Sequence, residues 1–274
     1  MGFSIAEGTA IPRWALVDYG SGGAATVYEG SIITAGAGGT PATQGVIAIG
    51  AASGAADTTH KYIPKGVVLS GNDFTPTYDS TYHGQKIVSV GTQATLLARD
   101  WRFVEGKFPK GEPATMVKYA DVLPSTVIRG SIYNSTFGTA PTVVTVTTGS
   151  TTGLGMTTTA ACFTPVAYNS TYYCRTGANK GLMRMGYHTS TTVCTFYNPF
   201  PYDIAIGDTF VAVNVGFDGT KRVQFDSTGS FIDTSAALTI DYYLVDIVNI
   251  NLEEAGNEYI DFRFNADHFS ANRA

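Results

Sequence analysis

The chain has 274 residues, of which 44% are hydrophobic and only 14% are charged, with a net charge of −5. The low charge and abundant Gly, Thr and Ser disfavour long helices, and the hydrophobic content excludes a disordered chain. An acidic balance without a Lys/Arg run argues against nucleic acid as a partner. No stretch resembles a membrane-spanning segment or a secretory signal, so no membrane partner is expected.

Short apolar or alternating runs, separated by Gly, Pro and Asn, predict many short β-strands. In chain order these are Trp14–Tyr19, Thr26–Thr34, Gly45–Ile49, Gly66–Leu69, Gln85–Val90, Thr95–Ala98, Ala114–Tyr119, Val127–Tyr133, Val143–Thr147, Ala161–Tyr168, Thr171–Arg175, Gly181–Tyr187, Thr192–Tyr197, Thr209–Val215 and Arg222–Phe225. Helix is expected at most as a turn near Tyr119–Leu123. The fold class is therefore predicted to be all-β, with a barrel or sandwich architecture.

The C-terminal region predicts a hairpin. Residues Ile240–Leu252 alternate, with the even positions apolar except Asp246, and Tyr259–Phe264 alternate again after a polar loop that contains Gly256. A long first strand with its even positions buried, paired with the second run, is expected.

Two β domains are predicted, over residues 1–123 and 126–274, because Pro124 disfavours continued strand pairing and the composition changes there. The Thr- and Gly-rich stretch Thr147–Thr159 predicts a long flexible loop. The terminal segments 1–10 and 265–274 are interpreted either as arms that reach neighbouring subunits or as frayed ends.

Catalytic signatures such as G-x-S-x-G, H-E-x-x-H, a Walker loop and G-x-G-x-x-G are absent. No catalytic, cofactor-binding or metal-binding residue is assigned, and no cofactor is expected. The four histidines are widely spaced and are interpreted as surface or hydrogen-bonded side chains: His60, His83, His188 and His268. The odd set of cysteines matches no metal or redox spacing and predicts reduced structural thiols: Cys162, Cys174 and Cys194.

Two clusters leave alternatives open. Loop carboxylates could offer oxygen ligands to calcium, although capping of turns is the commoner use of such residues: Asp203, Asp208, Asp218, Asp226 and Asp233. A tyrosine-rich region could line a carbohydrate site, although burial in a core or subunit interface is commoner: Tyr168, Tyr172, Tyr173, Tyr187, Tyr197 and Tyr202.

Three short pieces resemble virion structural proteins of tailed bacteriophages, in particular capsid decoration or cement proteins. They are Glu29-Gly30-Ser31-Ile32, Pro64-Lys65-Gly66-Val67-Val68-Leu69 and the β-corner Ile206-Gly207-Asp208-Thr209-Phe210. The resemblance is one of sequence style over scattered pieces, and the chain is longer than the smaller decoration proteins, which suggests an added β domain.

The resemblance implies a non-enzymatic protein that binds the outside of an icosahedral capsid, commonly as a homotrimer, and stabilises the shell. The implied partner is the major capsid protein, and the implied location is the virion surface after assembly in the host cytoplasm, where unpaired cysteines stay reduced. Two alternatives remain: another virion part, such as a tail-tube or jelly-roll capsid subunit, and a carbohydrate-binding or hydrolytic β module.

Overall fold

The structure is a computed structural model, and in the residues that it describes the ordered elements are β-strands. The described residues are 2–18, 25–35, 46–49, 63–71, 77–79, 85–91, 116–132, 142–159, 170–213, 215, 217, 220–225, 232–233 and 243–266. The predicted all-β class is confirmed. Two predicted strands, Thr95–Ala98 and Ala161–Tyr168, lie outside the described residues. No described helix is long and apolar enough to span a membrane.

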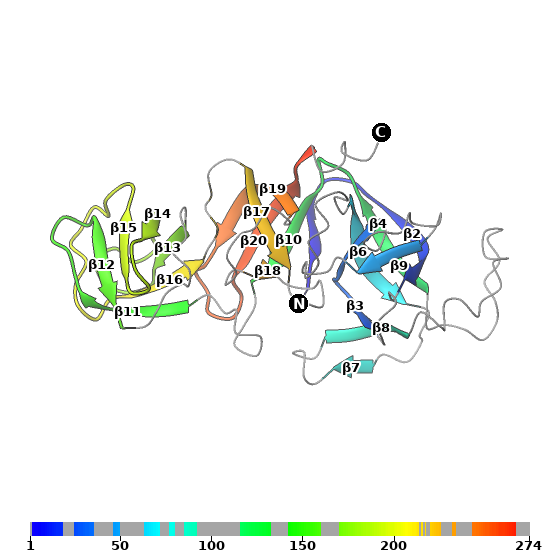
Figure 1. Ribbon diagram of the computed structural model, residues 1–274, viewed down its shortest axis with the longest axis horizontal. Coiled ribbons are helices and arrows are strands. Elements are labelled where there is room, and N and C mark those ends of the chain that lie inside the picture. The colour runs from blue at the N-terminus through cyan, green and yellow to red at the C-terminus, as the bar shows by residue number, and fades with distance from the viewer. Residues whose placement is uncertain are drawn as a thin grey trace.

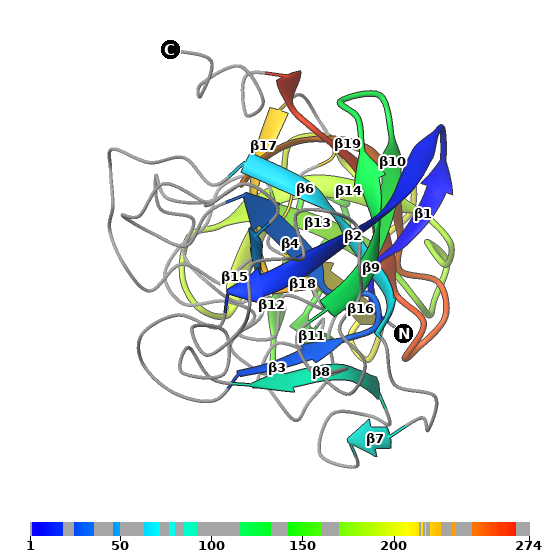
Figure 2. The same ribbon diagram turned by 90° about the vertical axis from the view of Figure 1, so that its right-hand side faces the viewer.

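Five strands close into a barrel, called here the N-terminal barrel. They are β2 (Ala10–Asp18), β5 (Val46–Ile49), β4 (Ile32–Ala35), β6 (Ile63–Gly71) and β9 (Met116–Val122). β9 closes the barrel because it pairs with both β2 and β6. A small sheet of β3 (Ala25–Tyr28), β8 (Gln85–Gly91) and β7 (Thr77–Asp79) lies on one side of the barrel (Figures 1 and 2).

Two local predictions in this region were wrong. The predicted strand Thr26–Thr34 is two strands, because Gly30 takes a φ of +82° in the turn between β3 and β4. This left-handed conformation suits glycine and turns the chain sharply. The predicted helical turn at Tyr119–Leu123 is instead strand through Val122, where pairing on both sides satisfies the backbone.

A six-stranded sheet, called here the central sheet, contains strands from both ends of the chain. Its order is β1 (Ser4–Glu7), β10 (Val127–Ser131), β20 (Tyr259–Phe264), β19 (Tyr243–Asn251), β17 (Thr220–Phe225) and β18 (Ile232–Asp233). β1 pairs with β10, so the residues from Ser4 to Glu7 are neither an arm nor a frayed end. The division at residues 123 and 126 stays a prediction, although the central sheet draws on both sides of it.

The predicted C-terminal hairpin is present as β19 and β20. One detail differs, because the strand register shifts between Ile247 and Asn249. Val245 is buried before the shift, Ile250 and Leu252 are buried after it, and Val248 is 48% exposed. A β-bulge inserts one residue and exchanges the two faces of a strand. The buried side chains therefore lie at odd positions before the shift and at even positions after it, whereas the sequence predicted even positions along the whole strand.

Aromatic rings from distant parts of the chain form the core beneath the central sheet. Phe3 contacts Phe225 with ring centroids 4.9 Å apart, and Phe262 contacts Phe264 at 5.5 Å, both in edge-to-face geometry. All four side chains are at most 3% exposed. Edge-to-face pairs add to the free energy of burial, so the N-terminal segment belongs to the same core as the C-terminal hairpin.

A second closed barrel, called here the outer barrel, forms one end of the molecule (Figure 1). Its strands in order are β11 (Thr142–Thr148), β12 (Gly155–Thr158), β15 (Val193–Phe196), β14 (Met183–His188), β13 (Ser170–Cys174) and β16 (Thr209–Val213). The prediction that Thr147–Thr159 is a flexible loop was therefore wrong. Its second half contains β12, which pairs with β15, and the Met156 and Thr158 side chains of this strand are buried.

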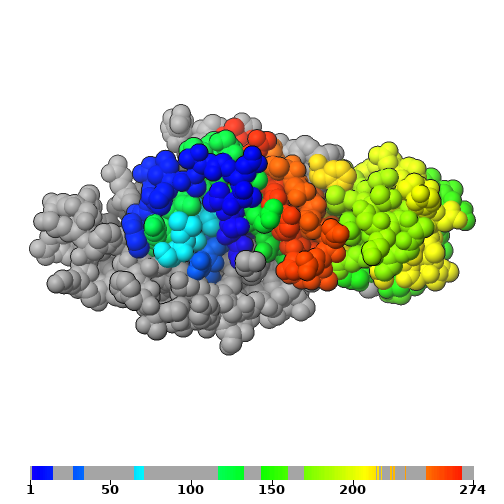
Figure 3. Space-filling view, turned by 180° about the vertical axis from the view of Figure 1, so that it is seen from behind, coloured from blue at the N-terminus to red at the C-terminus, as the bar shows by residue number. Residues whose placement is uncertain are grey.

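β16 belongs to two cores at once. Phe210 and Ala212 pack inside the outer barrel, whereas Val211 and Val213 pack against the core of the central sheet. Alternate side chains of a strand point to opposite faces, so a single strand supplies both cores. Figure 3 shows the orange and red C-terminal strands lying between the blue N-terminal strands and the yellow and green outer barrel. The outer barrel is thus packed onto the central sheet.

Candidate functional site

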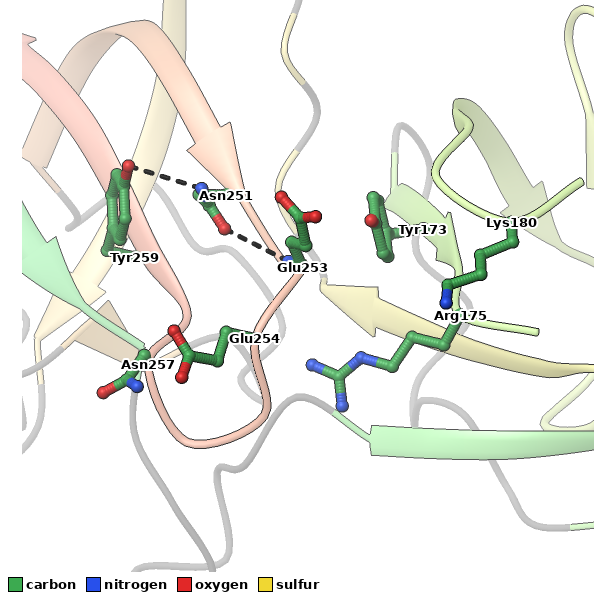
Figure 4. Close-up of a pocket in the computed structure, with 8 residues that line it drawn as sticks. All are labelled: Tyr173, Arg175, Lys180, Asn251, Glu253, Glu254, Asn257 and Tyr259. Atoms are coloured by element: carbon green, nitrogen blue, oxygen red, sulfur yellow. Dashed lines mark hydrogen bonds between the residues drawn. The ribbon is translucent and has the colours of Figure 1, made fainter.

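A pocket of about 590 Å³, called here the junction pocket, opens where the outer barrel meets the central sheet. The outer barrel contributes the end of β13 and the following turn, and the central sheet contributes the β19–β20 hairpin (Figure 4). Its volume lies in the range of about 300–1,000 Å³ typical of small-molecule sites. The lining residues are Tyr173, Arg175, Lys180, Asn251, Glu253, Glu254, Asn257 and Tyr259.

An ion pair holds the two walls of the pocket together. The Arg175 Nη2 donates to Glu258 Oε1 at 2.6 Å and to the Leu252 carbonyl oxygen at 3.0 Å. The second Glu258 oxygen, Oε2, accepts from the backbone N–H of Gly256 at 2.8 Å. The Arg175 and Glu258 side chains are only 14% and 6% exposed. The pair therefore ties the end of β13 to the β19–β20 loop in a position shielded from water.

Asn251 fixes the central-sheet wall. Its Nδ2 donates to the hydroxyl oxygen of Tyr259 at 3.4 Å, and its Oδ1 accepts from the backbone N–H of Glu253 at 3.1 Å (Figure 4). The guanidinium of Arg129 lies 3.8 Å from the centroid of the Tyr259 ring and forms a bidentate ion pair with Asp261. Stacked, hydrogen-bonded side chains of this kind hold a ring in a single orientation.

The two walls carry different charges. Lys180 projects from the barrel side, and Glu253 and Glu254 lie on the hairpin side (Figure 4). Burial raises the pKa of the Tyr173 hydroxyl, the nearby Glu253 carboxylate raises it further, and Arg175 lowers it. Tyr173 therefore stays protonated at neutral pH and can donate a hydrogen bond. The pocket offers donors from one wall and carboxylate acceptors from the other.

The tyrosines singled out in the sequence do not form one site. Tyr172 is fully buried in the outer-barrel core, and only Tyr173 lines the junction pocket. Tyr187 and Tyr197 form a ring pair with centroids 5.5 Å apart, and Tyr202 is 60% exposed in the connection between β15 and β16. Tyr168 lies outside the described residues. Neighbouring residues on a strand face opposite sides, which separates Tyr172 from Tyr173.

The acidic loop residues are also dispersed. Asp203 is exposed, whereas Asp208 is buried and its Oδ2 accepts from the backbone N–H of Ala205 at 2.9 Å. Asp208 therefore caps the turn that carries Gly207, at a φ of +91°, into β16. The structure does not describe Asp218, Asp226 or the side chain of Asp233. Among the described residues, no group of three or more His, Cys, Asp or Glu side chains is arranged to hold a metal ion.

Cys174 and Cys194 are reduced thiols buried in the outer barrel, as the sequence predicted, and Cys162 lies outside the described residues. Burial, together with a smaller contribution from the Asp208 carboxylate, raises the pKa of Cys174 from 9.0 to about 11. At pH 8 only about one Cys174 in a thousand is the reactive thiolate.

We expect iodoacetamide at pH 8 to leave Cys174 and Cys194 unmodified in the folded protein and to alkylate both in urea, as measured by peptide mass spectrometry. Rapid modification of Cys174 without urea would contradict this burial.

His188 is the histidine that the structure describes, and the other three lie outside it. It is 1% exposed in β14, and burial lowers its pKa below the usual 6.5. Below pH 6.5 the unfolded chain then binds more protons than the folded chain, so stability falls as the pH falls.

We expect the His188→Asn variant to lose less stability than the wild type between pH 7 and pH 5. The difference is limited to about 1.4 kcal/mol per pH unit for one proton. Urea unfolding followed by circular dichroism at pH 7, 6 and 5 measures it. An equal pH dependence in both proteins would show that His188 does not contribute.

Comparison with protein-family models, with curated proteins and with solved structures gives no match.

Proposed function

We propose that this chain is a non-enzymatic decoration protein that binds the outer surface of an icosahedral phage capsid and stabilises the shell. Its partner is the major capsid protein, and its location is the virion surface after assembly in the host cytoplasm. The resemblance of three sequence pieces to virion decoration proteins motivates the proposal. The observation that carries it is a group of exposed apolar side chains on the outer barrel.

These side chains form the barrel tip, defined here as residues 150–154 and 197–207. Leu154, Tyr197, Tyr202 and Ile206 are 45%, 48%, 60% and 75% exposed. The two segments are linked by backbone hydrogen bonds, since Ser150 and Ile204 form a bridge and Phe200 N–H donates to the Gly153 carbonyl. Tyrosine is enriched at protein–protein interfaces, and exposed apolar surface on a soluble protein often marks an interaction site.

Asn179 holds the barrel tip in place from within. This side chain is fully buried, and its Nδ2 donates to the carbonyl oxygens of Tyr202 and Asp203 at 2.9 and 3.1 Å. Its Oδ1 accepts from the backbone N–H of Tyr202 at 3.1 Å. The exposed Tyr202 ring is thus presented on an ordered backbone, and little conformational entropy is lost when it is buried in an interface.

The composition of the chain supports assembly on a lattice. Only 14% of residues are charged, so contact with a capsid removes few charges from water, and each buried apolar Å² contributes about 25 cal/mol. Repetition across a shell multiplies weak contacts. The reduced thiols Cys174 and Cys194 suit a protein that assembles in a reducing cytosol.

Light scattering on the size-separated chain tests the class of virion protein. We expect a discrete trimer, as implied by decoration of threefold or quasi-threefold positions. Rings, tubes or closed shells of the purified chain would overturn the proposal in favour of a tail-tube or capsid subunit. A monomer would contradict a trimer in solution, and trimers would then have to form only when the chain binds the capsid.

A further inference from the structure

We propose that the junction pocket binds a neutral saccharide, an activity that goes beyond attachment to a capsid. The pocket collects polar side chains that the fold itself does not use. In the described part of the chain, no hydrogen bond or ion pair involves the side chains of Lys180, Glu253, Glu254 or Asn257. They line one concavity from two separate structural units (Figure 4).

These groups match the chemistry of sugar hydroxyls. Each hydroxyl both donates and accepts, so it needs acceptors such as the Glu253 and Glu254 carboxylates and donors such as the Lys180 ammonium. The Asn257 amide supplies both functions, and the protonated Tyr173 hydroxyl supplies a further donor. A ligand with several adjacent hydroxyls satisfies both walls of the pocket at once.

Tyr259 supplies an apolar platform. One face of its ring is covered by the Arg129 guanidinium, 3.8 Å from the ring centroid, and the ring lines the pocket. The C–H face of a sugar ring packs on an aromatic face of this kind, while the phenol hydroxyl remains available for polar contacts. The Asn251 hydrogen bond and the Arg129 contact fix the platform before the ligand arrives, which lowers the entropic cost of binding.

The charges of the pocket disfavour other classes of ligand. Glu253 and Glu254 repel phosphates, nucleic acids and acidic sugars, and Arg175 is already paired with Glu258. A purely apolar ligand would leave these charged groups dehydrated without partners, which is costly. A neutral, hydroxyl-rich ligand avoids both penalties, so neutral hexose- and N-acetylhexosamine-containing glycans are the expected class.

The test is a printed array of neutral and acidic oligosaccharides, followed by titration of the strongest neutral glycan. We expect wild-type binding to a neutral glycan and at least tenfold weaker binding by Glu253→Gln and by Lys180→Ala. Neither substitution removes a hydrogen bond made within the described chain, so folding is preserved. Glu7→Gln in β1 and Lys65→Ala in β6 are matched controls, because they remove the same charges away from the pocket.

Three results would overturn the inference: a wild-type protein that binds no printed glycan, binding restricted to acidic glycans, or equal binding by the pocket variants and the controls. Capsid attachment is measured separately with the same variants. Unchanged attachment of Glu253→Gln to phage heads shows that the two activities use different surfaces. Loss of glycan binding alone does not weaken the capsid proposal, and failure to bind heads does not weaken the saccharide proposal.

Discussion

Replacing Arg175 with methionine is expected to lower the free energy of unfolding by about 3–5 kcal/mol, the usual effect of removing one partner from a buried ion pair. The Glu258 side chain would lose its cationic partner in a site that is 6% exposed, and the Leu252 carbonyl oxygen would lose its donor. Urea unfolding followed by circular dichroism measures the change. The effect is large because Arg175 joins the outer barrel to the central sheet.

A matched control is available in the N-terminal barrel. Arg13 pairs with Asp121 at 2.6 Å, but the two side chains are 55% and 24% exposed. An exposed ion pair contributes about 0–1 kcal/mol, so Arg13→Met should change stability little. The double variant Arg175→Met/Glu258→Met should be more stable than Arg175→Met alone, because no buried charge is left unpaired. Equal losses from Arg175→Met and Arg13→Met would contradict the role of the buried pair.

The second large effect is expected at the barrel tip. The double variant Tyr202→Ser/Ile206→Ser should bind phage heads at least about 30-fold more weakly, the loss that one interface hot spot of about 2 kcal/mol produces. Both side chains are mostly exposed, at 60% and 75%, so their removal should leave the fold intact. Co-sedimentation of increasing protein concentrations with purified heads measures the change in affinity.

Two exposed apolar residues elsewhere provide the control for this variant. Ile11 and Leu123 are 46% and 44% exposed, at the start of β2 and just after β9. The double variant Ile11→Ser/Leu123→Ser removes comparable apolar surface from the N-terminal side of the molecule. It should bind heads as the wild type does. Equal weakening by both double variants would show that the barrel tip is not the specific contact.

The sequence predicted the strands where period-two alternation is strong. Tyr259–Phe264 was predicted with its observed bounds because its apolar residues Ile260, Phe262 and Phe264 alternate with the charged residues Asp261 and Arg263. The bulge at Val248 was not predictable in the same way, since an inserted residue is defined by the register of the partner strand. β12 was missed because Thr and Gly dominate it, and only the closed barrel buries its Met156 and Thr158.

The junction pocket could not be found from spacing. Arg175 and Glu258 lie 83 residues apart in the chain and meet only because β16 packs the outer barrel onto the central sheet. The sequence placed Tyr172 and Tyr173 in one tyrosine-rich region. Strand alternation instead buries Tyr172 in the core of the outer barrel and leaves Tyr173 to line the junction pocket. The polar loop Glu253–Asn257 was interpreted only as a hairpin connection, and its position opposite Lys180 depends on the tertiary fold.

Saturation binding of the purified chain to expanded phage heads that lack this protein tests the proposed function most directly. We predict saturable co-sedimentation, with a copy number per head that is a multiple of three, and heads that resist heat better when occupied. Binding that does not saturate, or heads that neither retain the protein nor gain stability, would contradict a role in capsid decoration.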